Sequence, residues 1–296
     1  MEQYKNEMRH LVDKVETALR AFLPESGALH ATIYDAMRYS LLAGGKRIRP
    51  VIVLSFAKAF GVEESRAMPY ACALEMIHTY SLIHDDLPCM DNDDLRRGRP
   101  TNHKVYGDGV ATLAGDALLN RAFELSLKAM MEGDIPLQNA GMAIRLMADC
   151  AGADGMIGGQ IIDLEAEGKS LALSQLETLQ QMKTGALFVA SAKMGTLLAG
   201  APKEAQAAAE RFAQKLGLAF QIRDDILDVE GDVKELGKAT GHDAETNKST
   251  FVSVFGLEES KRRVQALTKE AIDALESIPN HDFLLYIAEI MGGRTK

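Results

Sequence analysis

Two clusters of aspartates are the part of this sequence whose residue types and spacing point most directly to chemistry. The first is Asp85-Asp86-Leu87-Pro88-Cys89-Met90-Asp91 and the second is Asp224-Asp225-Ile226-Leu227-Asp228. Each follows an apolar run with helical patterning, so neither is typical of a solvated acidic tail. Two carboxylates about 4 Å apart repel by roughly 4 kcal/mol at an effective dielectric constant near 20, and a raised pKa or a bound divalent cation relieves that repulsion. Oxygen ligands of this kind favour magnesium.

The helical spacing predicts how each cluster presents its carboxylates. Asp224 and Asp228 are four residues apart and project from one helix face, whereas Asp225 lies about 100° around the helix. Asp85 and Asp91 would lie on different faces of a regular helix. Because a proline, residue 88, removes a backbone donor between them, we expect the helix to bend or end there and to bring Asp91 back towards Asp85. One such cluster could equally be an acid-rich helix end, but the pair favours a metal site.

Basic segments near the clusters are suited to binding an anion. The segment Gly44-Gly45-Lys46-Arg47-Ile48-Arg49 combines a glycine pair, which lets backbone approach closely, with three cations. It therefore resembles a diphosphate clamp, although a basic helix–helix turn would also contain these residues. Arg96-Arg97-Gly98-Arg99 is expected to form a loop whose arginines bind phosphate oxygens.

The elements that position these residues are predicted to be helices. Apolar residues recur at spacings of three and four in the ranges 4–19, 29–43, 50–60, 68–86, 110–119, 137–151, 155–166, 174–198 and 216–228. A capping-box pattern at Ser174–Glu177 starts the long helix 174–198. Gly185 within that helix would cost about 1 kcal/mol relative to alanine and would allow a kink. Residues 230–248 lack apolar periodicity and are expected to form a loop, followed by final helices starting near 249 and 282.

Composition and pattern limit the class of protein. The 296 residues are 47% hydrophobic, which is sufficient for a sizeable core. Strand-like alternation, repeats and linkers are absent from the pattern, so the sequence predicts one all-α domain over residues 1–296. The net charge of −9 argues against general nucleic-acid binding. The three cysteines form no CxxC pair, and neither a signal peptide nor a membrane-spanning run is recognised, so we expect a cytoplasmic protein without a membrane partner.

The order of these segments closely resembles that of the trans-isoprenyl diphosphate synthases, over nearly the whole chain. The matching segments are Gly44–Arg47, Ser81–Asp86, Arg96–Thr101, Gly158–Gln160, Lys183–Gly185 and Gln221–Asp228. Within that family, the insertion Pro88-Cys89 and the aromatic residue Tyr80 resemble the bacterial, farnesyl-forming type. The resemblance implies a helical bundle around a deep central cavity, a homodimer, and isoprenoid diphosphates as small-molecule partners. It further implies a prenyltransferase that condenses isopentenyl diphosphate with dimethylallyl and geranyl diphosphate to give (2E,6E)-farnesyl diphosphate.

The same resemblance implies roles for individual residues. The metal ligands would be Asp85, Asp86, Asp91, Asp224, Asp225 and Asp228, which would hold three Mg²⁺ per active site when substrate is bound. The allylic diphosphate would be bound by Arg96, Lys183, Thr184, Gln221, Lys238 and Lys248. Isopentenyl diphosphate would be bound separately by Gly45, Lys46, Arg49, His78 and Arg97.

The expected chemistry is ionisation, condensation and elimination, with Lys183, Thr184, Gln221 and Arg96 as catalytic residues. Diphosphate leaves readily when metal and cationic side chains take up the charge that develops on it. Oxygen dipoles from Thr184, Gln221 and the carbonyl of Lys183 would stabilise the allylic cation, and a dry aliphatic wall would exclude water. The double bond of isopentenyl diphosphate then attacks, and the departing diphosphate accepts the final proton.

Product length is expected to depend on Tyr80 and Ser81. At 1.5 Å per residue, Tyr80 lies roughly 7–8 Å back along the helix from Asp85, in the direction in which the product grows. The ring would form a floor, and the small Ser81 would let the chain pass, which favours the fifteen-carbon product. A packed core tyrosine, with a geranyl or geranylgeranyl product, is the alternative.

Two further classes of protein account for part of the pattern. His84-Asp85 could belong to an HD-type metal phosphohydrolase, but the lysines and Gln221 would then have no role. A non-catalytic subunit of a prenyl synthase heteromer is the other alternative, although such subunits are expected to have degraded aspartate clusters and both clusters are intact here.

Overall fold

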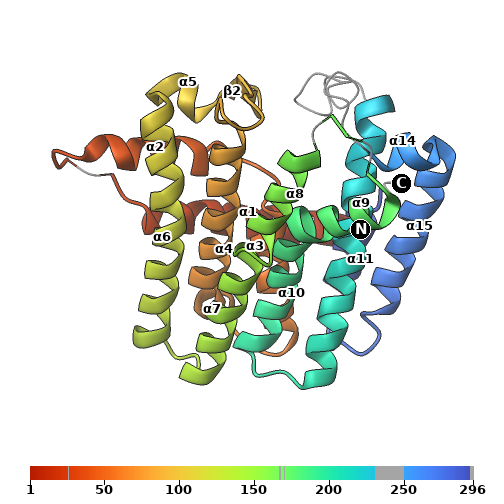
Figure 1. Ribbon diagram of the computed structural model, residues 1–296. Coiled ribbons are helices and arrows are strands. Elements are labelled where there is room, and N and C mark those ends of the chain that lie inside the picture. Colours follow the sequence, from red (N-terminus) through yellow and green to blue (C-terminus); the bar gives the residue numbers. More distant parts are fainter. Residues whose placement is uncertain (26, 167, 170, 231–249, 294–296) are drawn as a thin grey trace.

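Long helices that pack side by side form the body of the protein (Figure 1). The structure, a computed structural model, describes every residue except 26, 167, 170, 231–249 and 294–296. The helices of the first half are α1 (Glu2–Phe22), α2 (Ala31–Leu41), α3 (Ile48–Ala59), α4 (Glu64–Asp85), α5 (Asn102–Tyr106), α6 (Asp108–Glu132) and α7 (Leu137–Ala151). Those of the second half are α8 (Met156–Ala166), α9 (Leu173–Gln180), the π-helix η1 (Gln181–Gly185), α10 (Ala186–Leu198), α11 (Lys203–Glu230), α14 (Phe251–Phe255), α15 (Leu257–Asp273) and α16 (Asp282–Met291). The all-α prediction is confirmed.

The helices differ in how much of their surface is buried. In α1 the expected spacing of three and four buries a single face, formed by Leu11, Val15 and Leu19. By contrast, α3, α4 and α10 bury residues on most sides. Helix α4 packs against α3 and α6, and α10 packs against α3, α7 and α11. The helix that ends in the first aspartate cluster is therefore held in the interior of the bundle.

Helix α4 begins earlier than the sequence pattern indicates. The apolar pattern predicts a start near residue 68 or 69. The structure instead starts the helix at Glu64 and places Pro69 inside it. The proline ring carries no N–H for the carbonyl four residues earlier, so one backbone hydrogen bond is lost. Burial of the neighbouring Ala67 and Met68 favours the longer helix in spite of that loss.

The arginine-rich segment after the first cluster forms a short hairpin, which the sequence pattern did not indicate. Strands β1 (Leu95–Arg96) and β2 (Arg99–Pro100) pair antiparallel. The two residues between them, Arg97 and Gly98, have φ values of 53° and 72°. Positive φ at both central residues is what a type I′ hairpin turn requires. The expected loop is thus a defined turn that fixes the direction of each arginine.

The helix expected over 174–198 is interrupted. Helix α9 starts at Leu173, with the backbone N–H of Ala172 donating to the side chain of Gln175, so the capping box predicted at Ser174 is wrong. The next five residues, Gln181–Gly185, form the π-helix η1 before α10 continues. Single π-turns inside helices occur frequently at functional sites. The irregularity expected at Gly185 is therefore present, as a wider helical turn.

Within the described ranges, the buried apolar residues form two clusters. The smaller one contains Leu176, Leu179, Ile222, Ile226, Phe251 and Val264, and the larger one contains most of the remaining core. Helix α11 contributes to both, because Phe212 and Leu216 belong to the larger cluster. Figure 1 shows the hairpin, α5 and the C-terminal end of α11 at the same, upper end of the bundle. Among the helices of the described ranges, none is long and apolar enough to cross a membrane.

Candidate active site

The first aspartate cluster folds back on itself as expected. Asp85 is the last residue of α4, and the backbone N–H of Asp91 donates to the carbonyl of Asp85 at 2.9 Å. The turn is completed by Asn92, whose φ is 54°. The predicted bend is therefore confirmed, and it returns Asp91 to the end of the helix that carries Asp85.

The carboxyl of Asp85 lies in a crowded and poorly solvated environment. Burial raises its pKa, the nearby Lys183 opposes that rise, and the neighbouring Asp91 adds to it. No ion pair within 4.0 Å satisfies this carboxyl among the residues that the structure describes. A buried carboxylate beside another acid is stabilised in its charged form by a cation. Asp85, with Asp91 beside it, therefore has the character expected of a metal ligand.

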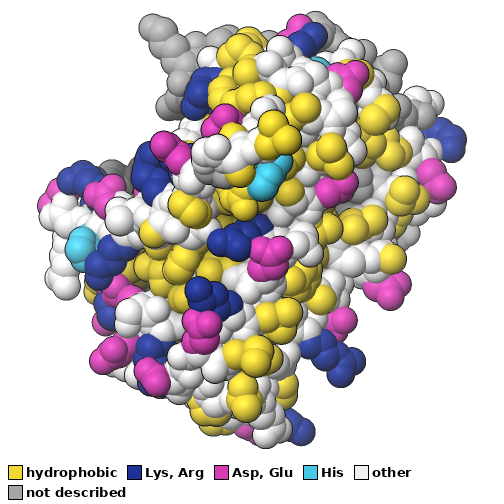
Figure 2. Space-filling view, turned by 90° about the vertical axis from the view of Figure 1, so that its left-hand side faces the viewer, with side chains coloured by type: hydrophobic (Ala, Val, Ile, Leu, Met, Phe, Trp, Pro, Cys, Tyr) yellow, Lys and Arg dark blue, Asp and Glu magenta, His cyan; other side chains and the backbone are white. Residues whose placement is uncertain are grey.

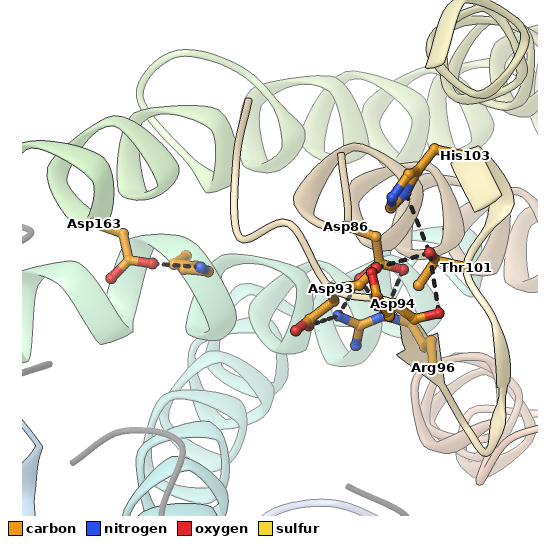
Figure 3. A network of polar contacts seen from close by, with 8 residues as sticks. Asp86, Asp93, Asp94, Arg96, Thr101, His103 and Asp163 are labelled. Atoms are coloured by element: carbon orange, nitrogen blue, oxygen red, sulfur yellow. Dashed lines mark hydrogen bonds and ion pairs between the residues drawn. The ribbon is translucent and has the colours of Figure 1, made fainter. Parts of the chain in front are cut away.

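Asp86 differs from Asp85 in its contacts. Its side chain is only 4% exposed, and both of its carboxylate oxygens accept from Nε of Arg96, at 2.7 and 2.8 Å. Figure 3 shows the guanidinium of Arg96 between Asp86 and Asp93, and the distance to Asp93 is 3.4 Å. Metal ligation by Asp86 stays a prediction. Its position favours another role, because a paired carboxylate orients Arg96.

In the second cluster, on α11, the aspartates also differ from one another in burial and contacts. Asp224 and Asp228 are partly exposed, whereas Asp225 is 5% exposed. The carboxylate of Asp225 accepts from the backbone N–H of Phe251 at 2.8 Å and lies 3.5 Å from the side-chain nitrogen of Gln221. The spacing argument that separated Asp225 from its two neighbours is consistent with this arrangement. Asp225 fixes the first residue of α14 against α11, and metal ligation by it stays a prediction.

The residues expected to bind isopentenyl diphosphate come together between α3, α4 and the hairpin. A guanidinium nitrogen of Arg49 lies 3.4 Å from Nε2 of His78, and Arg97 donates to the carbonyl of Gly44. A side chain in place of Gly45 would be strained, since φ is 144° here and a Cβ would also lie 2.9 Å from the guanidinium of Arg97. Lys46 lies close by and is exposed, with Nζ 5.9 Å from the centre of a phenylalanine ring on α11, residue 220.

The charges in this group favour an anionic ligand. Burial lowers the pKa of Arg49 to about 10, so the side chain remains charged at neutral pH. Its Nε is buried without a hydrogen-bond partner among the described residues. Burial and the nearby Arg49 lower the pKa of His78 well below its ordinary value, which keeps the imidazole neutral. The cluster thus holds unused donors and positive charge that a diphosphate would satisfy.

The residues expected to act on the allylic substrate lie on η1 and α11. The hydroxyl of Thr184 donates to Oε1 of Gln221 at 3.1 Å, so the structure brings these two residues together as expected. Nζ of Lys183 lies 2.6 Å from a carboxylate oxygen of Asp163 on α8 (Figure 3). Helix α8 can approach η1 closely because Gly159 has no side chain. A Cβ at this position would lie only 2.2 Å from the backbone nitrogen of Lys183.

Asp163 was not identified from the sequence as a site residue. The available signal was the matching segment Gly158–Gln160, which ends three residues before Asp163. An acid that pairs with a lysine on another helical segment has no local sequence pattern that marks it.

The residues proposed for product length are placed as follows. Tyr80 is 4% exposed, its hydroxyl has no hydrogen-bond partner among the described residues, and burial raises its pKa to about 12. Its ring packs edge-on against His84. Ser81 donates its hydroxyl to the carbonyl of His78 at 2.9 Å. A role of Tyr80 as a floor remains a prediction, because a packed aromatic residue would have the same contacts.

His84 is turned towards α6, which is unsuited to the metal dyad of an HD-type phosphohydrolase. Its Nε2 lies 3.0 Å from the carbonyl of Thr112, and a Cβ at Gly115 would lie 2.1 Å from the same nitrogen. The imidazole thus packs into a space left by a glycine on α6. Lys238 and Lys248, expected to bind the allylic diphosphate, lie outside the described residues.

The residues present fit magnesium in the way that substrate-bridging sites do. In the part of the chain that the structure describes, no three His, Cys, Asp or Glu side chains are grouped closely enough to enclose a metal ion. Mg²⁺ commonly binds through one or two carboxylates, with water and substrate phosphate oxygens completing its coordination. Carboxylates at two helix ends, together with nearby arginine and lysine, thus form a candidate site for magnesium and diphosphate in an all-α protein.

The comparisons with known proteins identify the family. The model of the polyprenyl synthetase family matches residues 30–281. The chain is 46% identical to the farnesyl diphosphate synthase of Geobacillus stearothermophilus, over 99% of this chain and 98% of that protein. It is 45% identical to the geranylgeranyl diphosphate synthase of Cyanophora paradoxa, over 95% of this chain and 93% of that protein. The chain therefore belongs to the polyprenyl synthetase family.

A solved structure agrees with this result. The apo crystal structure of a FPP/GFPP synthase from Zymomonas mobilis matches with a TM-score of 0.88 and 36% sequence identity, over 98% of this chain and 99% of that one. The helical arrangement described above is thus shared with an isoprenyl diphosphate synthase along nearly the entire chain.

Proposed function

We propose that the protein condenses isopentenyl diphosphate with dimethylallyl and geranyl diphosphate to give (2E,6E)-farnesyl diphosphate. The observation that carries this proposal is that the side chains of two adjacent arginines point to different groups of residues. Arg96 turns to Asp86, beside Asp85 and Lys183, whereas Arg97 turns to the glycine pair beside Arg49. Two anion-binding groups lie side by side, as a reaction between two diphosphates needs. The identity to farnesyl diphosphate synthases supports the choice of product.

Magnesium is part of this proposal. Asp85, Asp91, Asp224 and Asp228 would hold it together with substrate oxygens, and when bound it would neutralise charge on the allylic diphosphate. A complement of three ions per active site belongs to the same proposal. The carboxylates of Asp86 and Asp225 are already engaged by protein donors, so they would act by orienting Arg96 and α14.

The protein's own residues would then perform the following tasks. Lys183 has three donor hydrogens, so it can keep Asp163 and still bind an oxygen of the leaving diphosphate together with Arg96. The oxygens of Thr184 and Gln221 lie next to each other and would stabilise the allylic cation. The double bond of the second substrate attacks that cation, and the departing diphosphate accepts the proton. No enzyme nucleophile is needed.

The proposal also covers the organisation of the protein. We treat residues 1–296 as one domain, which is supported by the contribution of α11 to both apolar clusters. A homodimer is supported by apolar side chains on one stripe of α6, where Leu113, Leu127 and Met131 are 59%, 45% and 78% exposed. Figure 2 faces this side of the molecule and shows hydrophobic side chains at its surface. We also propose that the protein is cytoplasmic.

Geranylgeranyl diphosphate is the second candidate product, because similarity to a geranylgeranyl diphosphate synthase is nearly as high. The test is incubation of the purified protein with dimethylallyl and isopentenyl diphosphates and Mg²⁺, followed by chain-length analysis of the dephosphorylated products. We expect farnesol as the main alcohol. Geranylgeraniol would favour the second candidate, and release of phosphate without condensation would refute both. Chelation of Mg²⁺ should abolish condensation without unfolding, since the core is apolar.

A further inference from the structure

Arg47 is a buried cation between two residues assigned to isopentenyl diphosphate. It is 2% exposed, whereas the neighbouring Lys46 is exposed and Arg49 is partly so. Its backbone is left-handed, with φ 48° and ψ 34°, at the residue that caps the start of α3. A non-glycine residue keeps this conformation only where its surroundings impose it. The contacts of its side chain are therefore a source of the free energy that this conformation requires.

The guanidinium of Arg47 is bound from three helices. It donates to Glu75 of α4 at 2.6 Å, to Glu16 of α1 at 2.7 Å, and to the carbonyl of Leu41, the last residue of α2, at 2.6 Å. The side chain of Glu75 is 3% exposed and that of Glu16 is 21% exposed. Arg47 is thus fully engaged by protein groups and has no role as a direct ligand of substrate.

Glu75 also lies close to the cations of the isopentenyl diphosphate group. It is three residues before His78 on α4, and its negative charge acts on both Arg49 and Arg97, in which burial lowers the pKa and Glu75 opposes the lowering. The buried acid thereby lets several positive groups be held near one another without a bound anion.

We propose that Arg47, anchored by Glu75 and Glu16, is the positioning residue of the isopentenyl diphosphate site. The anchor imposes the left-handed turn, and the turn directs Lys46 and Arg49 to the same diphosphate. This inference rests on the proposed function, because it assigns a support to the site that function needs. Helix α1, which supplies Glu16 and none of the proposed ligands, thereby contributes to substrate binding.

One substitution distinguishes positioning from simple electrostatics, because the two predict opposite changes in the affinity for isopentenyl diphosphate. Glu75 is negative and lies near an anion-binding site, so by charge alone Glu75→Gln would strengthen the binding of isopentenyl diphosphate. Positioning predicts the opposite, since the turn loses its anchor. We expect the dissociation constant for isopentenyl diphosphate to rise about tenfold or more, while KM for the allylic substrate stays near that of the wild type.

The experiment is calorimetric titration of the apoprotein with isopentenyl diphosphate alone, which does not turn over without an allylic partner, supplemented by steady-state kinetics. The control is Glu210→Gln, which removes the partner of Lys193 across a 2.7 Å ion pair between α10 and α11. This control should leave the affinity for isopentenyl diphosphate unchanged. Unaltered or tighter binding by folded Glu75→Gln would overturn the inference.

A second variant covers the case in which Glu75→Gln does not fold, because an arginine left without its partner in the interior is strongly destabilising. The double substitution Arg47→Met/Glu75→Leu replaces the pair with apolar side chains, which commonly preserves stability. We expect it to fold and still to bind isopentenyl diphosphate at least about tenfold more weakly. Wild-type affinity in this variant would refute positioning by Arg47. Failure of the wild-type protein to bind isopentenyl diphosphate would instead refute the proposed function.

Discussion

Two neighbouring aspartates are predicted to have different effects on stability when each is changed to asparagine. Asp86→Asn breaks a buried ion pair in which Arg96 and Asp86 are 20% and 4% exposed. Loss of one partner of such a pair costs about 3–5 kcal/mol, and the residual contact with Asp93 at 3.4 Å places the expected loss near the lower limit. At about 2 °C per kcal/mol for a chain of this size, the melting temperature should fall by roughly 6 °C.

Asp85→Asn should leave the stability equal to that of the wild type or higher. Burial and the neighbouring Asp91 raise the pKa of Asp85, with only Lys183 and Arg96 in opposition. Because the folded-state pKa lies above that of the unfolded chain, the ionised carboxylate at neutral pH destabilises the fold. The neutral asparagine removes that cost. Activity should nevertheless fall by orders of magnitude, since this residue is a proposed metal ligand.

The assay is thermal and urea denaturation of both variants in the presence of chelator, so that metal binding does not contribute. Asp94→Asn is the control, because its 2.7 Å ion pair with Lys104 is 71% exposed on the aspartate side and surface pairs contribute about 0–1 kcal/mol. If Asp85→Asn were destabilised as much as Asp86→Asn, the different roles inferred for the two carboxylates would be wrong.

Three further predictions concern substrates, product and pH. Arg97→Ala should raise KM for isopentenyl diphosphate about tenfold or more, whereas Lys183→Ala should mainly lower kcat with the allylic substrate; equal effects on both substrates would contradict the two-site assignment. Tyr80→Ala should yield products of twenty carbons or longer and Ser81→Phe should favour the ten-carbon product, and chain-length analysis that still finds farnesol with Tyr80→Ala would remove the proposed floor. The pKa of buried His78 is depressed, so its contribution to the free energy of unfolding is complete above about pH 6.5 and is lost as the pH falls below that value. In urea titrations at several pH values, His78→Asn should therefore lose less stability at low pH than the wild type. An unchanged pH profile would exclude His78 as the source of the loss.

Features set by local rules were predictable from the sequence. The periodicity of α1, the turn at Pro88 and the separate direction of Asp225 follow from helical geometry and from the missing donor of proline. The gathering of Arg49 with His78 was expected from the family resemblance, and the structure supplies its geometry.

Other features depend on tertiary contacts and were missed. Pro69 sits inside α4 because packing of the buried helix outweighs one absent hydrogen bond. The hairpin needs a positive φ at Arg97, a residue with no intrinsic preference for it. Asp163 and Glu75 act through partners 20 and 28 residues distant, and a single sequence gives no sign of such pairs.

The turn between β1 and β2 has a geometric consequence for the reaction. Arg96 and Arg97 are consecutive, and their side chains leave the backbone towards different substrates under the proposed assignment. Consecutive Cα atoms are about 3.8 Å apart across a trans peptide, and relative motion of the helices does not change this distance. Under the proposed assignment, the side chains that bind the two diphosphates therefore start from Cα atoms at a fixed distance. Insertion of a glycine between these arginines would increase the separation of their Cα atoms by one residue. We expect this insertion to misalign the two reacting carbons, although every proposed ligand residue would still be present.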